Sequence, residues 1–222
     1  QIASCIGIAK HFGTEAAFPA WEYEKYFENP LPKLGKVGKS VKEQHFHFDF
    51  NQFNNDCDIT GWLQSEKYFE DCKEEIKKQF TFKFQSRLEI FEKDNGKQTI
   101  AISIRRGDYV NNPNYALLPI SYYIGALLKE FPDYHNYNII IFSDDIEYCK
   151  LHFQCLPNVY FAEGNAIEQL CLMSLCDHFI IANSTFSWWG CWLGEKPHSK
   201  IIKPNYHFGY EFGKLNDAKD FY

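Results

Sequence analysis

Residues 99–110 read TIAISIRRGDYV, a β-rich run that ends in two arginines, a glycine and an aspartate. The run shows no alternation of polar and apolar residues, which predicts a strand buried on both faces. Three similar runs follow, with helices expected between them at 121–131 and 165–176. These runs are NIIIF (138–142), NVYFA (158–162) and HFIIAN (178–183). Strands that alternate with helices predict an α/β fold built on a parallel sheet.

Two arginines at the end of a buried strand need either a partner or a ligand. Buried ion pairs, an anion site and an Arg-Gly-Asp adhesion signal are the three interpretations. Side chains alternate between the two faces of a strand, which places Arg106 on the face of Ile102 and Ile104, and Arg105 on the face of Ser103. We therefore expect Arg106 to be structural, buried and paired with a carboxylate. Arg105 should face an anion, because its guanidinium fork suits two phosphate oxygens.

A polar cluster follows each of the four predicted strands. The clusters are Arg105–Asp108, Ser143–Asp145, Glu163–Asn165 and Asn183–Phe186. Because ligands bind beyond the carboxyl ends of parallel strands, we expect the four clusters to form one site. The last cluster also starts a Trp-rich helix, whose N-terminus favours an anion. With Arg105 opposite, this helix would clamp a diphosphate.

The first 95 residues show other patterns. Apolar residues at helical spacing predict a helix over 1–12 that stops before Gly13. The alternation in HFHFDF (45–50) predicts a strand, and 65–82 predicts an amphipathic helix with Ser65 as its N-cap. The polar turn KDNGK (93–97) separates this part from the strand-rich part, so we expect two lobes, 1–95 and 96–222.

Composition excludes several classes of protein. The 222 residues are 45% hydrophobic and 23% charged with a net charge of −6, which argues against a nucleic-acid partner. Eight scattered cysteines without a C-x-x-C pair, and the lack of a signal peptide, favour reduced thiols and the cytoplasm. Because the sequence begins at Gln1 rather than Met, an upstream membrane anchor stays an open alternative. Asp56-Cys57-Asp58 has the D-x-D form of a metal motif, but such pairs are common by chance, and we expect no metal.

Four segments together resemble motifs of one family in order and spacing. They are GWLQSEKYF (61–69), IRRGDYV (104–110), FSDDIEYCK (142–150) and LMSLCDHFIIANSTFSWWGCWLG (172–194). They are similar to the α1,2-fucosyltransferases of glycosyltransferase family 11, from about Asp56 to Gly194. The resemblance implies a GT-B-like enzyme with two Rossmann-like lobes and no metal or other cofactor. It implies transfer of L-fucose from GDP-β-L-fucose to the 2-hydroxyl of a galactose-terminated oligosaccharide, with inversion.

The resemblance also implies roles for the two lobes and for single residues. Residues 1–95 would be the acceptor-side lobe, without the family's first strand and Gly-rich loop, and 96–222 would bind GDP-fucose. Arg105 would hold the β-phosphate and Asp144 would contact the nucleoside. The diphosphate cradle would be lined by Ser184, Thr185 and Phe186.

Two positions depart from the family pattern, which usually has His at Ser103 and Asp at Gln169. The adjacent Glu168 is then expected to replace that Asp as a donor contact. Asp108 is the candidate catalytic base, although a carboxylate that only pairs with Arg106 would look the same in sequence. The alternatives are a fucosyltransferase with another acceptor or linkage, and a non-catalytic sugar-binding or adhesion protein.

Overall fold

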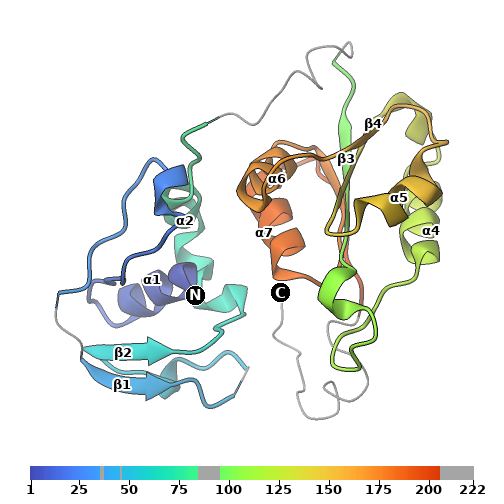
Figure 1. Cartoon of the computed structure of the whole chain (residues 1–222). Helices are drawn as coiled ribbons and strands as arrows, with labels where there is room; N and C mark the ends of the chain where they lie inside the picture. Colours follow the sequence, from blue (N-terminus) through green and yellow to red (C-terminus); the bar gives the residue numbers. More distant parts are fainter. Residues whose placement is uncertain (36–37, 46, 85–95, 206–222) are drawn as a thin grey trace. The chain divides into compact units, whose positions relative to one another are not determined.

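The computed structural model describes residues 1–35, 38–45, 47–84 and 96–205. These residues belong to two compact units, one within 1–84 and one within 96–205 (Figure 1). The predicted boundary between residues 95 and 96 lies at the end of a segment outside the described residues. Within the described ranges, none of the helices has the length and apolarity needed to span a bilayer. All eight cysteines lie in these ranges and are free thiols.

The second unit contains a five-stranded, fully parallel sheet in the order β5-β4-β3-β6-β7. Its strands are β3 (Thr99–Ile104), β4 (Asn138–Ser143), β5 (Val159–Phe161), β6 (His178–Ile180) and β7 (Ile201–Ile202). Its α-helices are α4 (Ile120–Glu130), α5 (Ile146–Phe153), α6 (Ala166–Ser174) and α7 (Thr185–Gly194), and short 3-10 helices occupy Gly107–Tyr109 and Tyr134–Asn136. The predicted α/β fold with a parallel sheet is confirmed.

Helices cover both faces of this sheet, as Figure 1 shows. On one face, Ile102 and Ile141 pack with Leu127 of α4 and Phe153 of α5. On the other face, Ile140 and Phe142 of β4 pack with residues of α6 and α7, among them Met173 and Cys191. Residues buried on both faces have no reason to alternate with polar ones, which explains the continuous apolar runs.

The strand order places a topological switch point beside β3. The chain runs from β3 outward through β4 and β5, and then returns to the other side of β3 to form β6. Because β4 and β5 lie on one side of β3 while β6 and β7 lie on the other, the connections diverge there, and a crevice is expected at the carboxyl ends of β3 and β6. The residues that follow these two strands are Arg105 and the Asn183–Phe186 segment.

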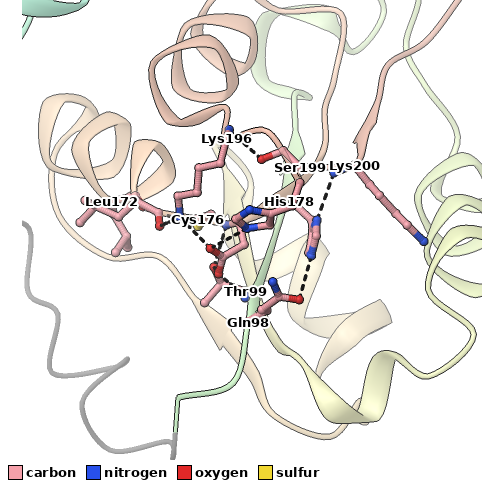
Figure 2. Close-up of polar contacts among 11 residues, drawn as sticks. Gln98, Thr99, Leu172, Cys176, His178, Lys196, Ser199 and Lys200 are labelled. Carbon is pink, nitrogen blue, oxygen red and sulfur yellow. Dashed lines mark hydrogen bonds and ion pairs between the residues drawn. The ribbon is translucent and has the colours of Figure 1, made fainter.

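A polar cluster closes the opposite end of the sheet, where β3 and β6 begin (Figure 2). Asp177 Oδ2 accepts hydrogen bonds from the backbone N–H and the hydroxyl of Thr99, both at 2.9 Å. Asp177 Oδ1 lies 2.6 Å from Lys196 Nζ. Burial alone would raise the pKa of Asp177, but the hydrogen bonds from Lys196 and Thr99 outweigh it and lower that pKa. The cluster therefore ties the start of β6 to the start of β3 and to the segment after α7.

His178 joins the same end of the sheet to β7. Its Nδ1 accepts a hydrogen bond from the Lys200 N–H at 3.1 Å, and its Nε2 lies 3.3 Å from Gln98 Oε1 (Figure 2). An Nδ1 that accepts must be unprotonated, so the neutral ring fits this position. Burial is the main cause that lowers the pKa of His178 below 6.5, and the nearby His198, Lys200 and Lys196 act in the same direction, against Asp177.

We expect the protein to lose stability as the pH falls below about 6.5. In this range the unfolded chain protonates His178 more readily than the folded chain does, so the proton favours unfolding. Urea unfolding should give a lower free energy at about pH 5.5 than at about pH 7.5. His178→Gln keeps an acceptor but does not titrate, so its pH dependence should be weaker. An unchanged pH dependence in this variant would contradict the assignment.

The first unit is smaller and contains a two-stranded parallel sheet, β1 (Lys39–Lys42) with β2 (Cys57–Thr60). Its α-helices are α1 (Ile2–His11) and α2 (Lys73–Gln79), and its 3-10 helices are Glu24–Tyr26, Phe50–Gln52 and Glu66–Cys72. The predicted helix over 1–12 is confirmed by α1. Buried Ile8, Tyr68 and Ile76 contribute to the core of this unit.

The prediction of a strand over 45–50 is wrong for the described residues of that segment. Asp49 instead caps a 3-10 turn, accepting a hydrogen bond from the Asn51 N–H at 2.8 Å. The rings of Phe48 and Phe50 both pack on Tyr68, with centroids 5.0 and 5.7 Å away. The spacing of Phe48 and Phe50 therefore reflects contacts with one buried tyrosine rather than a strand.

The single helix predicted over 65–82 is also corrected. A 3-10 helix, Glu66–Cys72, precedes α2, and Phe69 within this 3-10 segment has non-helical angles (φ −129°, ψ 19°). Ser65 occupies the predicted N-cap position but its side chain makes no capping bond. Tyr68 and Phe69, at this break in the helical backbone, are both buried.

Candidate functional site

Arg105 is the first residue after β3 and its guanidinium lies between two carboxylates. Nη1 is 3.0 Å from Asp144 Oδ2, and Nη2 donates to Asp108 Oδ1 at 2.6 Å. The guanidinium also lies 5.6 Å from the ring centroid of Tyr109. The Arg105 side chain remains 35% exposed, so donors of this fixed guanidinium remain accessible to a ligand.

Arg106 points to the other face of the sheet, toward the start of α5. Its Nε donates to Asp145 Oδ2 at 3.0 Å, and its guanidinium lies 3.4 Å from the ring centroid of Tyr148. Asp145 also caps α5 by accepting the Tyr148 N–H. The hydrogen bond from Arg106, followed by that from the Tyr148 N–H, lowers the pKa of Asp145. The carboxylate next to Arg106 is therefore Asp145, whereas Asp108 lies next to Arg105.

Asp144 connects the two arginines. Its Oδ2 faces Arg105, and its Oδ1 accepts the backbone N–H of Arg106 at 2.9 Å. Gly107 makes this approach possible, because a Cβ at that position would lie 2.5 Å from Asp144 Oδ2. Asp144 thus orients Arg105, and its contact with a nucleoside stays a prediction.

We expect Gly107→Ala to weaken GDP binding while the fold survives. The added methyl group would push Asp144 away and release Arg105 from its position, and weakening a charge-assisted hydrogen bond to phosphate costs up to about 1.5–3 kcal/mol of affinity. Calorimetry with GDP and a thermal melt measure the two effects. The matched control is Gly125→Ala in α4, where a Cβ meets nothing within 4 Å. Wild-type GDP affinity in Gly107→Ala would refute the role given to Asp144.

A cavity of about 170 Å³ lies beside Arg105, at the carboxyl ends of β3, β4 and β6. It is lined by Ser103, Ile104, Arg105, Phe142, Ser143, Asp144, Ala166, Gln169, Ser184, Phe186 and Ser187. Part of this lining is the first turn of α7, whose initial backbone N–H groups have no intrahelical acceptors. The cavity therefore combines a guanidinium with the positive end of a helix dipole, which is an arrangement suited to an anion.

Ser184 occupies the N-cap position of α7, but its side chain makes no capping hydrogen bond. The preceding residue is tied to the arginine loop, because the Tyr109 hydroxyl donates to the Asn183 carbonyl at 2.9 Å. Burial is the main cause that raises the pKa of Tyr109 to about 12, so this hydroxyl keeps its proton. The loop after β3 and the loop after β6 are therefore held together.

The sequence-predicted site residues are only partly brought together. Arg105, Asp144, Ser184 and Phe186 line the cavity. Asp108 is not a lining residue; it forms an ion pair with Arg105, and its side chain is 58% exposed. Thr185 and Glu168 are not among the lining residues.

Glu168 has a local structural contact instead of a place in the cavity. Its carboxylate accepts the Asn165 N–H at 2.8 Å in a capping box at the start of α6. Gln169, the neighbouring departure from the family pattern, lines the cavity. The donor contact expected of Glu168 stays a prediction, and its side chain would have to leave the capping box to make it.

Sequence reasoning missed the partner of Ser103. The Ser103 and Ser187 hydroxyls are hydrogen-bonded at 2.7 Å, and both side chains are buried. Ser187 lies three residues after Ser184 and therefore on the same helix face. This spacing is the one sequence signal that would have placed Ser187 near the predicted site. The pair joins β3 to α7 beneath the predicted phosphate position.

Metal ligands do not gather in this site. Across the described ranges, no group of three or more His, Cys, Asp or Glu side chains is arranged to hold a metal ion. The Asp56-Cys57-Asp58 string lies in the first unit, at the start of β2. Metal independence stays a prediction that needs an experiment.

Comparison with known proteins places the chain in a family. The model of glycosyl transferase family 11 matches residues 9–220, and the chain belongs to this family. The solved structure of fucosyltransferase NodZ from Bradyrhizobium has a similar fold, with a TM-score of 0.50 and 12% identity over 85% of this chain and 86% of that one. The GT-B-like fold class predicted from the sequence is therefore confirmed.

Two relatives have names that state an activity. The Escherichia coli protein named alpha-1,2-colitosyltransferase is 33% identical over 196 residues, which are 82% of this chain and 67% of that protein. The Bos taurus protein named galactoside 2-alpha-L-fucosyltransferase SEC1 is 26% identical over 221 residues, covering 87% of this chain and 60% of that protein. The chain thus spans about two thirds of the length of these relatives.

Proposed function

We propose that this chain is an α1,2-fucosyltransferase. It would transfer L-fucose from GDP-β-L-fucose to the 2-hydroxyl of a β-galactoside, with inversion and without a metal ion. One observation carries the proposal, namely that Arg105 and the N-terminus of α7 line the same cavity at a topological switch point. A volume of about 170 Å³ is smaller than a whole nucleotide-sugar site and suits the diphosphate portion.

The two anion-binding elements match the charge that develops in the reaction. The bond between fucose C1 and the β-phosphate oxygen breaks, and its electron pair leaves with GDP. Arg105 and the backbone N–H groups at the start of α7 would stabilise this growing negative charge where it appears. Both elements are held in position before the donor arrives, Arg105 by Asp144 and α7 by the contacts of Asn183 and Ser187. Little reorganisation is then needed during the reaction.

Asp108 would be the base that accepts the acceptor proton. In the structure Asp108 accepts a hydrogen bond from Arg105 Nη2. A phosphate oxygen of the donor would compete with Asp108 for this hydrogen bond. Its exposed side chain can move away when the diphosphate binds, which frees a carboxylate beside the reacting centre. The galactose 2-oxygen would then attack C1 from the face opposite GDP and pass its proton to Asp108.

We expect Asp108→Asn to lower turnover by about 10²–10⁴-fold, the usual contribution of general base catalysis. Its thermal stability should stay close to that of the wild type, because Arg106 has Asp145 as its partner. Steady-state rates and a thermal melt of the same preparation provide the two measurements. Turnover within about threefold of the wild type would eliminate Asp108 as the base.

The linkage is better supported than the transferred sugar. The names of both relatives specify attachment at the 2-position, one with colitose and one with fucose. A colitosyltransferase is therefore the second candidate function, favoured by the 33% identity of the bacterial relative. Both candidates attach a sugar at a 2-position, and they differ in the sugar transferred.

The test is transfer from GDP-fucose to a panel of β-galactosides in excess EDTA. GDP release and the linkage of the product are measured, with nucleotide-linked colitose as a parallel donor. We expect an α1,2-fucosylated product and a rate that EDTA does not change. Activity that requires added Mn²⁺ or Mg²⁺ would contradict the metal-free mechanism. GDP binding without any transfer would favour a non-catalytic sugar-binding protein.

A further inference from the structure

Trp62 is a large aromatic side chain that remains 63% exposed directly after β2. A single exposed apolar side chain is common on protein surfaces and proves little by itself. The backbone around Trp62 is nevertheless fixed by several specific contacts. This combination of a fixed backbone and an exposed indole needs an explanation.

One carboxylate holds the loop. Glu43 Oε2 accepts the Trp62 N–H at 2.7 Å, and both Glu43 oxygens lie 3.3 Å from the Leu63 nitrogen. The close approach depends on Gly61, because a Cβ there would lie 2.5 Å from Glu43 Cβ. Two successive N–H groups bound to one carboxylate leave the loop little freedom to rotate.

Leu63 adds backbone strain to the same loop. Its φ is +50°, a left-handed conformation that is unfavourable for a leucine. The side chain is buried at 3% exposure, and the Leu63 carbonyl accepts the buried Ser4 hydroxyl at 2.8 Å. Such strain persists where the surrounding structure enforces it, and it clusters at functional sites. Here its effect is to anchor Leu63 inward while the neighbouring indole faces solvent.

The position of the loop in the fold points to a ligand. Glu43 follows β1 and Gly61 follows β2, and the two strands are parallel neighbours, as Figure 1 shows. The loop therefore lies at the carboxyl ends of parallel strands, the edge where α/β proteins bind ligands. We propose that Trp62 is a stacking platform for a pyranose ring of the acceptor glycan. This inference rests on the proposed glycosyltransferase function and adds a specific acceptor contact to it.

The chemistry of the indole fits this role. Its flat apolar face can cover the C–H face of a galactose ring, and its N–H can donate to a sugar hydroxyl. A tryptophan has only two side-chain torsions, so little conformational entropy is lost on binding. Fixing the backbone through Glu43 and Leu63 reduces that loss further.

Kinetics of three variants of the whole chain test the proposal. We expect Trp62→Ala to raise the KM for lactose about tenfold, with little change in the Kd for GDP. Trp62→Phe keeps a flat ring and should stay within about threefold of the wild type. Tyr23→Ala removes another exposed aromatic of the same unit and should leave the KM for lactose unchanged. An unchanged KM in Trp62→Ala, or an equal rise in Tyr23→Ala, overturns the proposal.

Saturation-transfer NMR with lactose and the GDP-loaded chain separates this inference from the proposed function. Binding of lactose that Trp62→Ala abolishes supports the stacking platform even when no fucose is transferred. Fucose transfer with lactose binding independent of Trp62 supports the enzyme and overturns the platform. Absence of lactose binding to the wild type also overturns it. A Trp62→Ala change from dimer to monomer in sedimentation would assign the indole to a contact between two copies and overturn the proposal.

Discussion

The arrangement of the site depends on the contact between Asp144 and the two arginines. The pairing of Ile104 with Ser143 brings the ends of β3 and β4 together, so that Arg105 and Asp144 are neighbours. One carboxylate then receives the Arg106 backbone N–H and the Arg105 side chain. The two consecutive arginines point to opposite faces of the sheet because side chains alternate along the strand, and Asp144 contacts both residues. A Cβ at position 107 would lie 2.5 Å from Asp144 Oδ2, so any larger residue there would force this contact to shift.

The fold of the second unit could be predicted because its strands are buried on both faces. Full burial removes polar alternation, so TIAISI and NIIIF read as strands from the sequence alone. The same strands predicted where three of the four polar clusters would meet, because carboxyl ends of parallel strands share an edge. The fourth cluster, Glu163–Asn165, is not among the residues that line the cavity. Arg105, Asp144, Ser184 and Phe186 follow from this rule and lie at one cavity.

Other features could not be read from the sequence, because they depend on contacts between distant residues. The sequence offers Asp108, Asp144 and Asp145 as carboxylates near Arg106, and only the packing of α5 selects Asp145. The hydroxyl pair of Ser103 and Ser187 joins residues 84 positions apart. In the first unit, aromatic residues that alternate around 45–50 suggested a strand because the buried ring of Tyr68 on which they pack was unknown.

The central claim is that Arg105 holds the β-phosphate of the donor. Calorimetry with GDP and GMP tests it most directly, because the two ligands differ only in that phosphate. For Arg105→Ala we predict a loss of about 10–150-fold in affinity for GDP, equivalent to about 1.5–3 kcal/mol, and an affinity for GMP within about twofold of the wild type. Unchanged GDP affinity, or an equal loss for both nucleotides, would contradict the account.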